Sequence, residues 1–133
     1  MQAESKTAQP LVPAADAEAR IAEAAETILR AIGEDPTRDG LVDTPRRVAR
    51  AMLELTSGYA GDPYEILGTV FEEPAGAPAG DLVIVEGIPF HALCEHHLLP
   101  FPGVATVGYV PNGRIVGLSK LAPAVRACAR GLQ

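Results

Sequence analysis

The chain has 133 residues, of which 47% are hydrophobic and 21% are charged. These values are typical of a soluble globular domain with a modest core. The net charge of −6 argues against a general nucleic-acid-binding protein. No apolar stretch is long enough to span a bilayer, which argues against a membrane protein. The N-terminus lacks the basic start and apolar core of a signal peptide, and two cysteines do not make a disulfide framework. We therefore expect a cytoplasmic protein.

The charge is unevenly distributed along the chain. Residues 1–86 carry 7 basic and 16 acidic side chains, hence −9, whereas residues 87–133 carry 4 basic and 1 acidic, hence +3. The second part is therefore better suited to an anion. Within the acidic part, Arg46, Arg47 and Arg50 form a basic cluster. Such a cluster fits a solvated helix face as well as a binding site.

Two helices are predicted in the N-terminal half. Apolar residues recur at helical spacing over 16–32. A second helix is predicted to begin with Thr44 as its N-cap and Pro45 at its first helical position, and to end near Ser57. Arg47 and Arg50 would then be neighbours on one side of this helix.

The pattern changes to strands in the C-terminal half. Residues 82–90 and 104–110 are rich in β-branched residues and predict strands. Residues 111–113, Pro-Asn-Gly, are expected to turn the second strand into a third at 114–117. From Leu118 the apolar spacing becomes helical again. Helices and antiparallel strands are segregated along the chain, which predicts the α+β class.

These elements suggest one domain with a tail. Residues 1–15 are polar and contain two prolines, so we expect a disordered tail there. Residues 16–133 would form the domain, with a helical region at 16–58 and strands plus a helix at 82–133. Residues 72–80, rich in Pro, Ala and Gly, would connect the two regions flexibly.

The short stretch Cys-Glu-His-His at 94–97 concentrates metal-binding side chains. Cys94 and His97 have the spacing that lets a thiolate and an imidazole in a tight turn reach one zinc ion. His96 is either a third ligand or a group that serves a substrate, and Glu95 is expected nearby but not on the metal. Because a zinc site needs three or four protein ligands, the motif alone is half a site, and a chance clustering remains the alternative.

Two other residues are weaker candidates for metal binding. Cys128 lies on the apolar stripe of the predicted last helix, where a cysteine usually acts as a small hydrophobic residue. His91 lies on the strand before the motif and is expected to pack or to support a ligand.

A second constellation, Gly-Leu-Ser-Lys at 117–120, leads directly from a strand into a helix. Free N–H groups at a helix N-terminus favour a phosphate, and Ser119 and Lys120 would add a hydroxyl and a positive charge. The alternative is that Ser119 is simply the N-cap of the helix.

Together these motifs resemble a known family. The stretch CEHHLLPFPGVATVGYVPNGRIVGLSKLA resembles the signature region of GTP cyclohydrolase I, and GEDPTRDGLVDTPRRVARAM resembles its N-terminal region. The resemblance implies a tunnelling fold (T-fold) of antiparallel strands and helices that assembles into homodecamers. It also implies zinc-dependent hydrolysis of GTP to formate and 7,8-dihydroneopterin triphosphate, the first step of tetrahydrofolate and pterin biosynthesis.

The resemblance also assigns roles around the CEHH motif. Cys94 and His97 match two of the three zinc ligands of the family. His96 matches a catalytic histidine beside the imidazole ring of the substrate, at the carbon that is attacked by water on zinc.

Four further residues match contacts to the triphosphate of GTP. Ser119 and Lys120 are two of them. Arg47 and Arg50 match basic residues that reach the triphosphate from a neighbouring subunit, which requires an oligomer.

The sequence departs from the family pattern in several places. Pro123 replaces a triphosphate-binding arginine, Ala92 replaces a common serine, and Gly131 replaces a commonly basic residue and is expected to fray the last helix. Family members continue past the position of Gln133 with a guanine-recognising Gln-Glu pair, the third zinc ligand and a proton-handling histidine.

These departures lead us to expect a truncated chain that is inactive or impaired alone. Three alternatives stay open. The chain could be a non-catalytic or regulatory subunit in mixed oligomers with a complete enzyme, one half of a split enzyme, or a relative in a deazapurine pathway.

Overall fold

The computed structural model describes residues 14–68, 70–72 and 81–133. Most of the predicted tail (1–13) and of the predicted connection (73–80) lies outside the described residues. The helices and strands are α1 (Ala14–Ala31), α2 (Thr44–Leu55), a 3₁₀ turn η1 (Ser57–Ala60), α3 (Pro63–Ile66), β1 (Val70–Glu72), β2 (Val83–Leu93), β3 (Pro100–Tyr109), β4 (Arg114–Val116) and α4 (Leu118–Ala129). This order confirms the α+β class and agrees with part of a T-fold. Within the described residues no helix is both long and apolar enough to cross a membrane.

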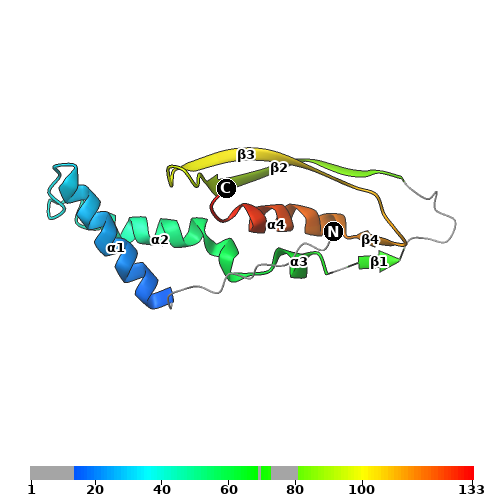
Figure 1. Cartoon of the computed structure of the whole chain (residues 1–133), viewed down its shortest axis with the longest axis horizontal. Coiled ribbons are helices and arrows are strands. Elements are labelled where there is room, and N and C mark those ends of the chain that lie inside the picture. Colours follow the sequence, from blue (N-terminus) through cyan, green and yellow to red (C-terminus); the bar gives the residue numbers. More distant parts are fainter. Residues whose placement is uncertain (1–13, 69, 73–80) are drawn as a thin grey trace.

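The elements form an elongated molecule (Figure 1). The β2–β3 hairpin packs over α4, and α3 lies on the opposite side of α4. The pair α1 and α2 extends from the end of the molecule at which β2 and α4 finish.

The two N-terminal helices pack through small residues. Ala25 of α1 and Ala49 of α2 are both buried, so the two backbones can approach closely. The prediction of Thr44 as N-cap is wrong, because the cap is Asp43. Asp43 makes no capping bond, since its carboxylate instead pairs with Arg47 at 3.0 Å.

The main sheet is the two-stranded antiparallel pair β2–β3. It pairs Val83 with Tyr109 at one end and Leu93 with Pro100 at the other. A bulge interrupts the ladder between Val85 and Ile88, and Gly87 takes a positive φ of 72° there. Both strands are longer than predicted, because a strand with a free edge tolerates prolines that would disrupt a central strand.

The predicted pairing of the third and second strands is wrong. β4 pairs with β1, from Val70↔Val116 to Glu72↔Arg114, and not with β3. Tyr109 provides the link to β4 instead, since its hydroxyl accepts a bond from Val116 N at 3.1 Å and lies 3.3 Å from Val116 O. The three residues of β1 are too few to show an alternating pattern, so the sequence does not predict the partner strand of β4.

The described core is small and lies between β2 and α4. Ile88, Ala92 and Leu93 of β2 are buried, as are Leu121 and Ala124 of α4. Leu93 is the largest side chain among the described residues that is fully buried.

The buried face of α4 differs from the predicted apolar stripe. Leu118 is 60% exposed and Cys128 is also exposed, although both lie on that stripe. Ala124 and Ala129 are buried instead. Their small side chains let α4 lie close against its neighbours. The interpretation of Cys128 as a buried hydrophobic residue is therefore wrong.

Candidate functional site

The CEHH motif forms the turn that joins β2 to β3. Cys94 N donates a hydrogen bond to Leu99 O at 2.9 Å, and Leu98 N donates to Cys94 O at 2.8 Å. These bonds close a tight turn in which Leu98 takes a φ of 56°. A bulky side chain rarely adopts this left-handed conformation, and such strain is often found at functional sites.

The turn brings a thiol and an imidazole together. Cys94 Sγ lies 3.5 Å from His97 Nδ1 and 4.0 Å from His96 Nδ1. Two ligands of a tetrahedral zinc, with bonds of about 2.3 Å to sulfur and about 2.0 Å to nitrogen, lie roughly 3.5 Å apart. The geometry of Cys94 and His97 therefore fits two ligands of one zinc ion, and His96 fits less well.

The remaining candidates do not complete this pair. Within the described ranges, no three His, Cys, Asp or Glu side chains gather closely enough to hold a metal ion. Glu95 lies 3.9 Å from His96 Nε2, and both side chains are largely exposed. His91 lines a separate groove, and Cys128 lines another.

Ser119 and Lys120 lie in the first turn of α4. The N-cap is Gly117, so the alternative interpretation of Ser119 as N-cap is wrong. The first turn of α4 contains no acidic side chain and no side-chain cap, and Lys120 N bonds to Gly117 O at 2.8 Å. The remaining N–H groups, the Ser119 hydroxyl and the Lys120 ammonium form a positively charged helix end of the kind that attracts phosphate.

The two motifs lie at opposite ends of α4. The C-terminal end of this helix adjoins Leu93, next to the CEHH turn, whereas Ser119 and Lys120 are at its start (Figure 1). A helix of 12 residues is about 18 Å long. Within one chain, the Cys94–His97 pair and the N-terminal end of α4 therefore do not lie in one site.

Arg47 and Arg50 lie at a third place, on the exposed side of α2. Arg47 pairs with Asp43 at 3.0 Å and Arg50 pairs with Glu18 at 3.3 Å. Arg46 also reaches Glu18, at 3.5 Å. Exposed ion pairs of this kind contribute little to stability, so these guanidinium groups can exchange a carboxylate for a phosphate at low cost.

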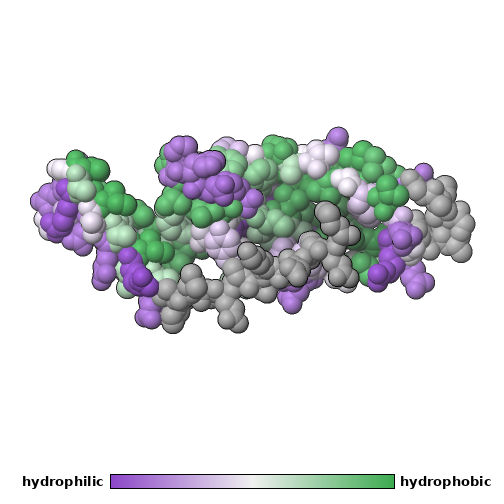
Figure 2. Space-filling model, in the orientation of Figure 1, coloured by the Kyte–Doolittle hydropathy of each residue, from purple (hydrophilic) through white to green (hydrophobic). Residues whose placement is uncertain are grey.

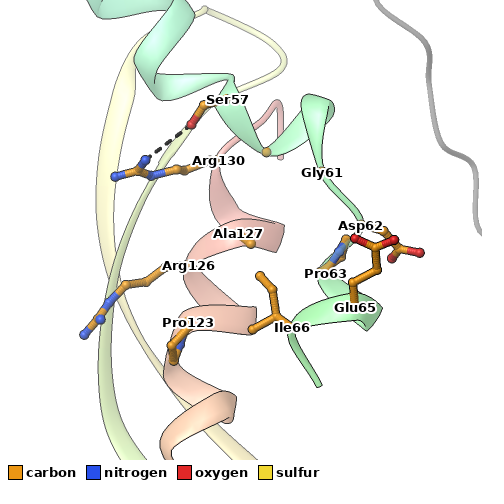
Figure 3. Close-up of a pocket in the computed structure, with 11 residues that line it drawn as sticks. Ser57, Gly61, Asp62, Pro63, Glu65, Ile66, Pro123, Arg126, Ala127 and Arg130 are labelled. Carbon is orange, nitrogen blue, oxygen red and sulfur yellow. Dashed lines mark hydrogen bonds between the residues drawn. The ribbon is translucent and has the colours of Figure 1, made fainter. Parts of the chain in front are cut away.

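A groove of about 520 Å³ lies away from all of these residues, between η1, α3 and α4 (Figure 3). Ile66 of α3 and Ala127 of α4 face one another across it. The guanidinium groups of Arg126 and Arg130 point away from the groove, and that of Arg130 bonds to Ser57 Oγ at 3.3 Å. The surface of the groove is therefore mainly apolar, although Asp62 and Glu65 also line it.

One feature beside the CEHH turn is not predicted by the sequence. Gly131 lies just beyond the end of α4 and is buried beside the ring of Tyr59. The hydroxyl of Tyr59 accepts a bond from Leu132 N at 2.7 Å. The only hint in the sequence was a glycine where the family has a larger residue.

Comparison with known proteins gives a consistent result. A model of the GTP cyclohydrolase I family matches residues 21–133. A protein named GTP cyclohydrolase 1 from Brucella anthropi is 52% identical over 119 residues, which are 90% of this chain and 53% of that protein. The proteins of the same name from Allorhizobium ampelinum and Brucella suis are each 53% identical over 110 residues, which are 83% of this chain and 54% and 51% of those proteins. The chain thus spans about half the length of the curated relatives it matches.

Proposed function

Because the chain belongs to the GTP cyclohydrolase I family, we propose that it takes part in the zinc-dependent hydrolysis of GTP to formate and 7,8-dihydroneopterin triphosphate. This reaction would be the first step of tetrahydrofolate and pterin biosynthesis in the cytoplasm. Residues 16–133 would form the GTP cyclohydrolase I-like domain. The observation that carries the proposal is the 3.5 Å separation of Cys94 Sγ and His97 Nδ1, which fits one zinc ion.

In this proposal each residue near the CEHH turn has a distinct task. Cys94 and His97 would hold zinc. When bound, zinc would lower the pKa of a water molecule and so supply a nucleophile near neutral pH. His96, 4.0 Å from the thiol and largely exposed, would face the imidazole ring of guanine and exchange a proton with it.

The triphosphate would be bound by groups from more than one chain. Ser119 and Lys120 would bind it at the N-terminus of α4, where the first-turn N–H groups and the helix dipole add to the lysine charge. Since this helix end and the CEHH turn are separated within one chain, we infer that a neighbouring subunit completes the site. Arg47 and Arg50 would reach the triphosphate from a neighbour in the same way.

A second candidate function is supported by the small number of metal-binding side chains at the CEHH turn. The described residues offer two metal ligands with suitable geometry, and no third side chain joins them. A subunit of this composition would contribute phosphate contacts to mixed oligomers with a complete enzyme, rather than catalyse the reaction alone. The alternatives of a split enzyme and of a deazapurine-pathway relative have no observation of their own in the structure.

Formate release from GTP tests the proposal. The purified protein would be assayed with added zinc beside its Cys94→Ala variant. Release above that of the variant would support catalysis that depends on Cys94. If no formate appears, the assay would be repeated with a full-length GTP cyclohydrolase 1 mixed in at a fixed, low concentration.

The mixed assay distinguishes the two candidate functions. A rise in the activity of the complete enzyme that is lost with Lys120→Ala would support the mixed-oligomer function. A folded protein that releases no formate and leaves the complete enzyme unaffected would contradict both.

A further inference from the structure

The backbone on both sides of Cys94 is held by the segment 131–133. Leu93 N donates to Gly131 O at 3.2 Å, and Gln133 N donates to Leu93 O at 2.8 Å. Glu95 N donates to Gln133 O at 3.0 Å. Because these bonds flank Cys94, the position of segment 131–133 fixes the direction from which its thiol leaves the backbone.

Segment 131–133 is in turn held by the η1 turn. Tyr59 Oη accepts from Leu132 N at 2.7 Å, and Gly58 N donates to Arg130 O at 2.9 Å. A Cβ atom on Gly131 would lie only 2.9 Å from the ring of Tyr59, so the close contact requires glycine there. A chain of contacts thus runs from Tyr59 through segment 131–133 to Cys94.

We propose that Tyr59 is a positioning residue for the metal ligands, acting through segment 131–133 to keep Cys94 Sγ within 3.5 Å of His97 Nδ1. This inference rests on the proposed zinc-binding function. Tyr59 lies on η1, outside the CEHH turn, and its hydroxyl bonds to Leu132 and not to Cys94 or His97. Tyr59 is 47% exposed, its ring lies against Gly131, and its hydroxyl forms the hydrogen bond to segment 131–133.

The test compares two tyrosine variants that each lose one hydroxyl. Tyr59→Phe removes the acceptor for Leu132 N. Tyr64→Phe is the matched control, because Tyr64 is 58% exposed on α3 and its hydroxyl has no hydrogen-bond partner among the described residues. Cobalt(II) replaces zinc, since the charge-transfer absorption from a thiolate to cobalt reports directly on Cys94.

Two readouts are measured on each protein. We expect Tyr59→Phe to bind cobalt about three- to tenfold more weakly than the unmodified protein, which is the effect of losing one hydrogen bond. Amide hydrogen exchange at Glu95 and Gln133 should accelerate by a similar factor. Tyr64→Phe should change neither quantity.

The readouts separate failure of this inference from failure of the proposed function. If the unmodified protein gives no thiolate–cobalt absorption, the proposed zinc binding by Cys94 fails. Amide hydrogen exchange at Glu95 then decides whether Tyr59 holds the CEHH turn. Unchanged exchange at Glu95 in Tyr59→Phe would overturn the inference. Faster exchange with unchanged cobalt affinity, where cobalt does bind, would also overturn it, because Tyr59 would then be purely structural.

Discussion

At the scale of single residues, the distances around Cys94 rank the two adjacent histidines as metal ligands. His97 Nδ1 is 3.5 Å from the thiol and His96 Nδ1 is 4.0 Å away. We therefore expect His97→Ala to weaken cobalt binding by about tenfold or more, and His96→Ala to weaken it less. His91→Ala is the control, since His91 lies on β2 outside the turn. A larger loss in His96→Ala than in His97→Ala would reverse the assignment.

A second residue-scale prediction concerns the loop between α1 and α2. Hydrogen bonds from the Thr37 hydroxyl at 2.7 Å and the Thr37 N–H at 2.9 Å lower the pKa of Asp35. Because the folded-state pKa lies below the unfolded one, this carboxylate stabilises the loop above the unfolded pKa. That contribution is lost as the pH falls through the lowered value.

An NMR titration of the Asp35 carboxyl carbon measures this shift. Thr37→Val removes the hydroxyl and should move the pKa of Asp35 back towards its ordinary value. An identical pKa in both proteins would show that the Thr37 hydroxyl has no such effect.

Residue chemistry was predictable from the sequence where partners are close along the chain. Cys94 and His97 are three positions apart, and their spacing predicted the proximity that the structure shows between Sγ and Nδ1; a shared metal ion stays a prediction. Tyr59 was missed because its partner, Leu132, is 73 positions away, and no local pattern connects the two. The N-cap of α2 was misplaced by one residue, since both Asp43 and Thr44 are common capping residues.

At the scale of elements, Pro123 in α4 is expected to lower the stability of the protein. This proline lies inside the helix, so the carbonyl of Ser119 receives no N–H from it. Pro123→Ala should restore the bond and stabilise the protein by up to about 3 kcal/mol, measured by urea unfolding. An unchanged or lower unfolding free energy would mean that the helix already accommodates the ring without cost.

The same position also tests the phosphate-binding role of α4. Pro123→Arg restores the N–H as Pro123→Ala does and adds a positive charge. If the start of α4 binds the triphosphate, the arginine variant should bind GTP about tenfold more tightly than the alanine variant, because a hydrogen bond to a charged group contributes roughly 1.5 kcal/mol or more. Calorimetric titration at low and high salt measures this difference. Equal affinities in the two variants would place the triphosphate elsewhere.

Element types were easier to predict than element pairing. The apolar spacing correctly indicated α1, α2, α4 and the two long strands. The predicted pairing of β4 with β3 is wrong, because β4 pairs with the three-residue strand β1. β3 contacts β4 through the hydroxyl of Tyr109 instead of through a ladder of backbone hydrogen bonds. The buried side of α4 was also rotated from the prediction, since Ala124 and Ala129 pack more closely than the larger side chains of the stripe.

At the scale of the whole molecule, the placement of the three candidate groups could not be read from the sequence. The CEHH turn and the N-terminal end of α4, which carries Ser119 and Lys120, are separated by the length of α4. Arg47 and Arg50 lie on α2, at a third place. Only the resemblance to a multi-subunit family indicated that such groups meet between chains.

The surface of the described residues supports assembly. Large hydrophobic side chains are exposed on both long strands and beside their ends: Ile84 is 52% exposed, Val104 71%, Leu99 65% and Val110 56%. Apolar surface recurs from the helical end to the strands on the coloured part of the face that Figure 2 shows. Monomeric soluble proteins rarely expose apolar patches this extensive, so we expect that a large part of this surface is covered in the assembled protein.

Sedimentation velocity over a range of concentrations tests this expectation. We expect species larger than the 13.9 kDa monomer at micromolar concentration. Val104→Lys, which puts a charge at the most exposed large hydrophobic side chain of the described residues, should shift the distribution towards monomer, because a buried unpaired charge is costly. Glu72→Lys is the control, since its side chain is already charged and exposed on β1. A folded monomer at every concentration would contradict assembly and, with it, the proposal that the site forms between chains.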